Sequence, residues 1–95
     1  MNIGKEVLIA ANCYIIDANH NYKSNLLPIR LQGFNVKPVI LYDGVWAGTN
    51  TTILPGATIF EGAIIGANSL VSSSISMNMI AFGSPAKEVK SRFDK

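Results

Sequence analysis

A six-residue period of apolar residues runs through this chain in two blocks. Every sixth residue is aliphatic or alanine, at Ile3, Ile9, Ile15, Leu41, Ala47, Ile53, Ile59, Ile65 and Val71. Because 48% of the residues are hydrophobic, such a set in one chosen frame would arise by chance roughly once in a thousand sequences. A period of six fits neither a helix nor a plain two-sided strand, so it indicates a structural repeat.

The other positions of each hexad favour a short strand followed by a corner. With the apolar residue as position one, position four of the second block holds residues that tolerate left-handed backbone angles. These are Gly44, Asn50, Gly56, Gly62, Asn68 and, less typically, Ser74. Position five, from Val45 to Ile75, is mostly small or β-branched and leaves room for the position-one side chains. Three hexads would close one triangular coil, and coils would stack with parallel strands about 4.8 Å apart.

The repeat divides the chain, which we expect to be one domain over residues 1–95. One coil spans residues 3–20, an insertion loop 21–38, two coils 41–76 and a C-terminal extension 77–95. The loop carries large apolar residues, namely Leu26, Leu27, Ile29, Leu31 and Phe34. A disordered linker would not need them, so we expect the loop to pack on a neighbouring chain. The only stretch with helical spacing is 86–93, where Val89 and Phe93 are four residues apart.

Composition excludes several classes of protein. No apolar run approaches the roughly 18 residues of a membrane-spanning helix, and the N-terminal residues do not resemble a signal peptide. The net charge of +2 is too small to indicate nucleic-acid binding. The single cysteine, Cys13, excludes an intrachain disulfide and is compatible with a reducing compartment. We therefore expect a cytoplasmic protein without nucleic-acid or membrane partners.

Several motifs together resemble the hexapeptide-repeat acyltransferases. The runs 42–50, 53–59 and 65–69 are similar to that family's hexapeptides, and Gly83-Ser84-Pro85-Ala86-Lys87 is similar to its closing Gly-Asn-Pro-Ala-Lys. Upstream, Asp17-Ala18-Asn19-His20-Asn21-Tyr22 resembles the family's catalytic segment. The similarity covers residues 3–90. It is nearest to the branch that acetylates sugars, which includes maltose, galactoside and surface-polysaccharide O-acetyltransferases.

The resemblance implies an all-β protein, a left-handed parallel β-helix of about three coils. The handedness comes from the resemblance alone, because crossovers between parallel strands are usually right-handed. It also implies a homotrimer with active sites between subunits. Acetyl-CoA would be the donor co-substrate, and the acceptor would be a saccharide or another small hydroxylated molecule. No metal is implied.

Acetyl transfer to an alcohol needs a base, and His20 matches the family's catalytic histidine. A neutral imidazole can take the hydroxyl proton during attack. Asp17 lies three residues earlier and could hold the ring in its useful tautomer, although it also reads as a corner residue. Asn19 and Asn21 flank the base and could bind sugar hydroxyls or simply form the loop. Tyr22 could line the acceptor pocket or pack against the protein.

Other residues match family positions that contact the cofactor. Trp46 is the only tryptophan, faces outward, and by resemblance flanks the pantetheine arm or the acceptor. Gly48-Thr49 and Gly66-Ala67 match positions whose backbone hydrogen-bonds the pantetheine, and such groups could also stabilise the oxyanion. The alternative is that their small size only serves the geometry of the hexads.

The C-terminal segment supplies candidate groups for the CoA phosphates. Pro85 and Lys87 belong to the closing motif, and Lys90 and Arg92 follow it. The alternative reading of these cations is a solvated tail. A Thr-Lys that members of the family often carry reads Ser72-Ser73 here.

Two further readings compete with the enzyme. Family members usually carry coils or a helical segment upstream of the position of Ile3, so the chain could be a truncated, non-catalytic trimeric module. A zinc hydratase of the same fold needs three histidine ligands, and the chain has one histidine. We expect Cys13 to pack inside and not to act as a nucleophile, which favours direct transfer without an acyl-enzyme.

Overall fold

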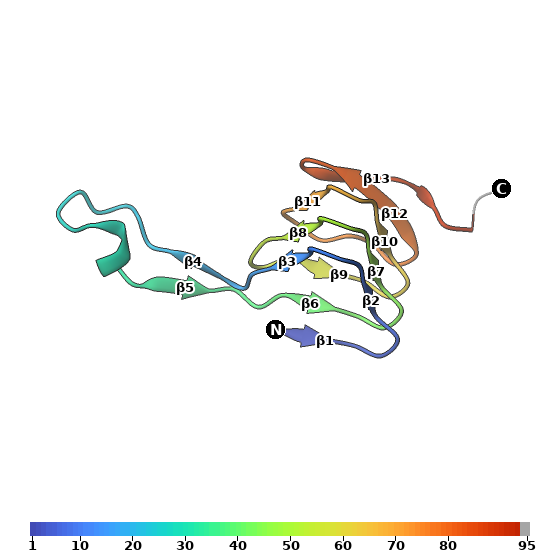
Figure 1. Ribbon diagram of the computed structural model, residues 1–95. Helices are drawn as coiled ribbons and strands as arrows, with labels where there is room; N and C mark the ends of the chain where they lie inside the picture. The colour runs from blue at the N-terminus through green and yellow to red at the C-terminus, as the bar shows by residue number, and fades with distance from the viewer. Residues whose placement is uncertain (94–95) are drawn as a thin grey trace.

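Three sheets of short, mostly parallel strands wrap around one axis in the computed structural model, which describes residues 1–93 (Figure 1). Residues 94–95, the end of the expected extension, lie outside the described residues. Sheet A contains β1 (Asn2–Ile3), β6 (Ile40–Leu41) and β9 (Thr58–Ile59). Sheet B contains β2 (Leu8–Ile9), β7 (Trp46–Ala47), β10 (Ile64–Ile65), β12 (Met79–Gly83) and β13 (Ala86–Ser91). Sheet C contains β3 (Tyr14–Ile15), β8 (Thr52–Ile53) and β11 (Leu70–Val71).

The six-residue period sets the register of all three sheets. Position-one residues of successive coils are direct strand partners: Ile3, Leu41 and Ile59 in sheet A; Ile9, Ala47 and Ile65 in sheet B; Ile15, Ile53 and Val71 in sheet C. The corners follow as expected at position four, because Asn50 and Asn68 take positive φ angles of 60° and 62°. Each hexad is therefore one short strand and one turn.

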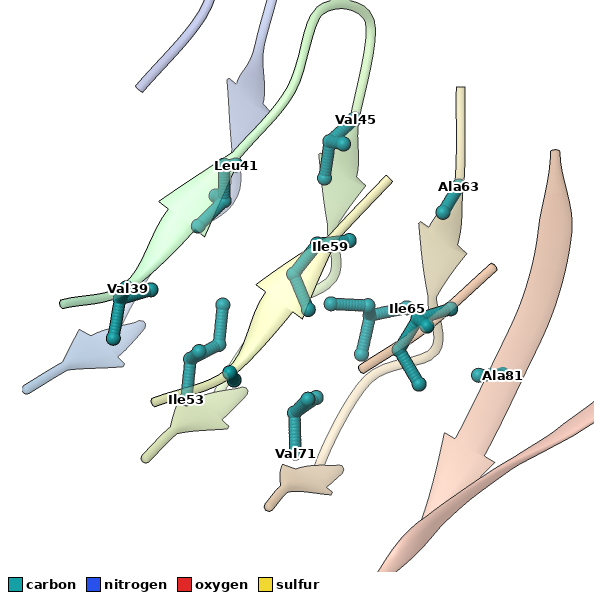
Figure 2. Close-up of a cluster of buried hydrophobic side chains, with 11 residues drawn as sticks. Val39, Leu41, Val45, Ile53, Ile59, Ala63, Ile65, Val71 and Ala81 are labelled. Carbon is teal, nitrogen blue, oxygen red and sulfur yellow. The ribbon is translucent and has the colours of Figure 1, made fainter. Parts of the chain in front are cut away.

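The core fills the inside of this triangular stack (Figure 2). Position-one and position-five side chains of the second and third coils are buried, as Val45, Ile53 and Ile59 illustrate. The first coil is different, because it lies at the end of the stack and only one of its two sides is covered by another coil. Its residues Ile3 and Ile9 remain 48% and 39% exposed. Burial thus increases along the axis away from the N-terminus.

A partial fourth coil continues the stack beyond the predicted third. Ile75 pairs with Ile59, and Ala81 pairs with Ile65. Each pair is sixteen residues apart, whereas Leu41 and Ile59 are eighteen apart, so the corner after Val71 is two residues shorter than the others. Our assignment of Ile75 to position five was wrong, because it stands in line with position-one residues.

The C-terminal segment is a strand and not a helix. β13 pairs with β12 in antiparallel orientation at the edge of sheet B. This ladder satisfies the backbone over residues 86–91 and outweighs a single four-residue spacing between Val89 and Phe93. Within residues 1–93 the only helix is a 3₁₀ turn, η1 (Ile29–Leu31), and none there is long or apolar enough to cross a membrane.

The insertion projects from the stack as an antiparallel hairpin (Figure 1). Its strands are β4 (Ala18–His20) and β5 (Phe34–Val36), and η1 lies near its far end. Its large apolar side chains are exposed, up to 87% for Leu26. That the hairpin packs on a neighbouring chain stays a prediction.

Candidate active site

A cavity of about 390 Å³ lies against the hairpin and brings together four of the predicted site residues. Asn19 and His20 come from β4, and Asn21 and Tyr22 follow directly. The remaining lining residues come from the rest of the insertion: Lys23, Ser24, Gln32, Asn35 and Lys37. The lining residues carry amide, imidazole, hydroxyl and ammonium groups, which can hydrogen-bond a polar ligand.

Side-chain amides hold the wall of this cavity in place. The Asn21 side-chain amide donates to the Gln32 carbonyl at 3.0 Å, and its oxygen accepts from the Asn35 amide at 2.8 Å. The Gln32 amide donates to the Ser24 and Leu27 carbonyls, while its oxygen accepts from the Ser24 N–H. These bonds fix the chain that follows His20, so the amides act first as structural groups.

Asp17 is not hydrogen-bonded to His20 within the described residues. Its carboxylate lies 3.6 Å from the Met1 amine, and its carbonyl accepts from the Lys37 N–H at 2.7 Å. Side chains three residues apart on an extended backbone point to opposite faces. The local geometry therefore gives Asp17 other partners than the imidazole.

Two lysines, Lys23 and Lys37, line the cavity in addition to the predicted site residues. Lys37 follows β5 and is fixed to the stack, because its carbonyl accepts from the Gly56 N–H at 3.0 Å. Lys23 lies on the hairpin. A prediction of the hairpin would have placed Lys37 near the candidate site. Pairing of Asn19 with Asn35 puts Lys37 beside Asp17.

The predicted cofactor residues gather on sheet B, away from the cavity. Trp46 lies on β7 and is 49% exposed. Gly48 and Gly66 directly follow β7 and β10, and both are required by close packing of coils. A Cβ at Gly48 would lie 2.8 Å from the Ile65 oxygen, and one at Gly66 would lie 2.8 Å from the Phe82 Cβ.

The amides of these two glycines are already bonded within the stack. The Gly48 N–H donates to Ile65 and the Gly66 N–H to Ala81, each at 2.8 Å. By contrast, the N–H groups of Thr49 and Ala67 have no protein acceptor within residues 1–93. Of the four predicted backbone positions, Thr49 and Ala67 thus keep donors available to a ligand.

The C-terminal cations differ in what they contact. The Arg92 guanidinium donates to the Gly62 carbonyl at 3.1 Å and lies 4.9 Å from the Phe93 ring centroid. Lys87 and Lys90 are exposed on β13, and Pro85 precedes that strand. Lys87 and Lys90 are therefore available to a phosphate, whereas the Arg92 guanidinium is occupied by its hydrogen bond to the turn at Gly62.

The contacts of Tyr42, Phe60 and Cys13 lie outside the cavity. Tyr42 and Phe60 stack on each other with ring centroids 5.4 Å apart, at the ends of β6 and β9. They belong to sheet A, so they do not narrow the face that carries Trp46. Cys13 is partly buried, and its thiol donates to the Gly48 carbonyl at 3.1 Å.

Comparison with known proteins gives the class. No protein-family model matches the chain. It is 39% identical to a probable acetyltransferase, Rv3034c, of Mycobacterium tuberculosis, over 97% of this chain and 31% of that protein. It is 36% identical to the putative lipopolysaccharide biosynthesis O-acetyl transferase WbbJ of Escherichia coli, over 95% of this chain and 50% of that one. The chain thus spans a third to a half of these relatives.

Solved structures agree with the sequence relatives. A galactoside acetyltransferase in complex with coenzyme A superposes with a TM-score of 0.85 at 31% identity, over 94% of this chain and 44% of that chain. This match confirms the left-handed parallel β-helix. The chain is thus similar in sequence and fold to proteins named as acetyltransferases, among them a lipopolysaccharide O-acetyl transferase and a galactoside acetyltransferase.

Proposed function

We propose that this chain acts as an acetyl-CoA-dependent O-acetyltransferase on a saccharide or another small hydroxylated acceptor. The observation that carries the proposal is the position of His20, the only histidine, in a cavity of about 390 Å³ lined by hydrogen-bonding side chains. Relatives named as acetyltransferases, and a similar structure that binds coenzyme A, support the reaction class.

In the proposed reaction, the His20 imidazole takes the proton of the acceptor hydroxyl as its oxygen attacks the thioester carbonyl. The tetrahedral intermediate collapses with release of the CoA thiolate, which takes the proton back from the imidazolium. Such general-base assistance contributes typically ~10² to 10⁴ in rate. Backbone N–H groups at Thr49 and Ala67 are suitable donors to the oxyanion. The transfer is direct and needs no acyl-enzyme.

The same proposal includes a homotrimer with active sites between subunits. Support comes from the separation of two sets of residues, because the cavity lies on the hairpin while Trp46 and the exposed lysines of β13 lie on sheet B. A second chain is the simplest way to bring a hairpin and a sheet B together. The exposed apolar residues of the hairpin, such as Leu26, would then be covered. A reducing cytoplasm fits the free Cys13.

A non-catalytic trimeric module is the second candidate. The observation that favours it is the exposed first coil, where Ile3 and Ile9 lie open in a chain that spans a third to a half of its named relatives. In this case the fold and the assembly would persist without turnover.

Isothermal titration with acetyl-CoA, combined with size-exclusion chromatography, separates the two candidates. The enzyme predicts a trimer with micromolar binding that His20→Ala leaves unchanged, while the same variant loses ~10² to 10⁴ of its transfer rate. Absence of binding at millimolar acetyl-CoA would overturn the enzyme and favour the module. Equal transfer rates in wild type and His20→Ala would show that His20 is not the catalytic base.

A further inference from the structure

We propose that the cavity beside His20 binds an acceptor through an anionic group, a carboxylate or a phosphate carried by the saccharide. The proposal rests on the proposed function and names its substrate class. It follows from the groups that line the cavity and from what each of them already contacts.

Two of the four side-chain amides that line the cavity, those of Gln32 and Asn21, are engaged within the hairpin. Both N–H groups of the Gln32 amide and its oxygen make hydrogen bonds within the hairpin. The Asn21 amide donates to Gln32 and accepts from Asn35. Redirecting these groups to a ligand would break bonds that hold the loop, and each such group left unpaired costs free energy.

The cations of the cavity are, in contrast, without a carboxylate partner. Lys23 and Lys37 both line it, no acidic side chain does, and neither lysine forms an ion pair within residues 1–93. Two positively charged side chains that line one cavity repel each other, and an anion bound between them would relieve that repulsion. The net charge of the whole chain is only +2. The positive charge of Lys23 and Lys37 is therefore a local feature of the cavity and not a property of the whole surface.

Lys37 is also held in place before any ligand arrives. Its N–H and carbonyl bond to Asp17 and Gly56, and its stem lies alongside Gly56. Fixing the stem reduces the conformational entropy lost when the ammonium binds a ligand. Lys37 and His20 line the same cavity, so an anion held by Lys37 would bring the rest of the acceptor close to His20.

Three matched probes test the charge directly: glucose, glucuronate and glucose 6-phosphate, which differ only at carbon six. The proton on Cε1 of His20 gives one assignable signal in the proton NMR spectrum, because the chain has a single histidine. Titration of each sugar into the full chain, followed at that signal, yields three dissociation constants. The variants are Lys37→Gln and Lys23→Gln, and Lys5→Gln on the first coil is the matched control.

We expect one or both charged sugars to bind at least about tenfold more tightly than glucose. Added salt should reduce that difference, Lys37→Gln and Lys23→Gln should each reduce it, and Lys5→Gln should leave it unchanged. A preference for glucuronate identifies a carboxylate, and one for glucose 6-phosphate identifies a phosphate. Equal binding of all three sugars, no binding of any, or a preference that survives both lysine variants would overturn the proposal.

Titration of the same samples with acetyl-CoA keeps the two proposals apart. A charge preference without cofactor binding would support the anion site and overturn the acetyltransferase. Cofactor binding without a charge preference would leave the acetyltransferase and overturn the anion site.

Discussion

The Ser76 backbone N–H donates a 2.7 Å hydrogen bond to the Glu88 carboxylate, which ties strand β13 to the start of the fourth coil. Hydrogen bonds from Ser76, first through its side chain and then through its backbone, lower the pKa of Glu88. The ionised form is therefore favoured by folding.

The lowered pKa predicts acid sensitivity of the C-terminal hairpin. The contact stabilises β13 at pH values above the ordinary glutamate range, and this stability is lost as pH falls through the lower, folded-state pKa. Hydrogen exchange of β13 amides, followed from about pH 6 to about pH 3, should show faster opening at low pH. Glu88→Gln should remove much of that dependence, whereas the exposed Glu61→Gln should retain it.

The gradient of burial along the axis predicts unequal effects of the same substitution in sheet A. Ile59 is 0% exposed and Ile3 is 48% exposed. Ile59→Ala should reduce the free energy of unfolding by about 2–5 kcal/mol, and Ile3→Ala by much less. Urea unfolding measures both. Equal losses would mean that the first coil is covered in solution.

Close approach of coils makes Gly48 intolerant of a side chain. A Cβ there would lie 2.8 Å from backbone atoms of Ile65 and Ala67, which cannot rotate away. Gly48→Ala should destabilise the chain by about 1–3 kcal/mol in thermal or denaturant unfolding. Thr49→Ala, at the exposed neighbouring position, is the control. An unchanged melting temperature in Gly48→Ala would contradict the packing.

The basic residues near the C-terminus should separate into two classes. Arg92→Gln loses the bond to the Gly62 carbonyl and should lower the free energy of unfolding by about 1 kcal/mol, with little effect on CoA affinity. Lys87→Gln should leave stability unchanged and weaken CoA binding roughly tenfold if its ammonium contacts a phosphate. Calorimetry and thermal unfolding of both variants check this. The reverse pattern would exchange the two roles.

The fold could be predicted from the sequence because the six-residue period is a local property of each coil. The spacing of residues such as Ile53 and Val71 is enough to predict that they are strand partners. The partial fourth coil was missed because the short corner before Ile75 breaks that spacing, although Ile75 and Ala81 are again six apart. The extension was ambiguous because antiparallel pairing with β12 is a tertiary contact.

The candidate site was only partly accessible to sequence reasoning. Asn19 to Tyr22 are contiguous, so the resemblance to the family's catalytic segment predicted all four as site residues. Lys37 and Gln32 reach the same cavity through pairing of β4 with β5, which no period marks. The sequence also could not reveal that the amides of Gly48 and Gly66 are already bonded between coils.

Strand β13 marks the C-terminal end of the stack in sheet B. A coil added beyond the C-terminus would need a parallel edge on all three sheets, and sheet B offers an antiparallel strand there. The N-terminal face still presents the open edges of β1, β2 and β3. A second copy therefore cannot continue the parallel register of sheet B at the C-terminal end of the stack, which disfavours end-to-end growth of the coils there.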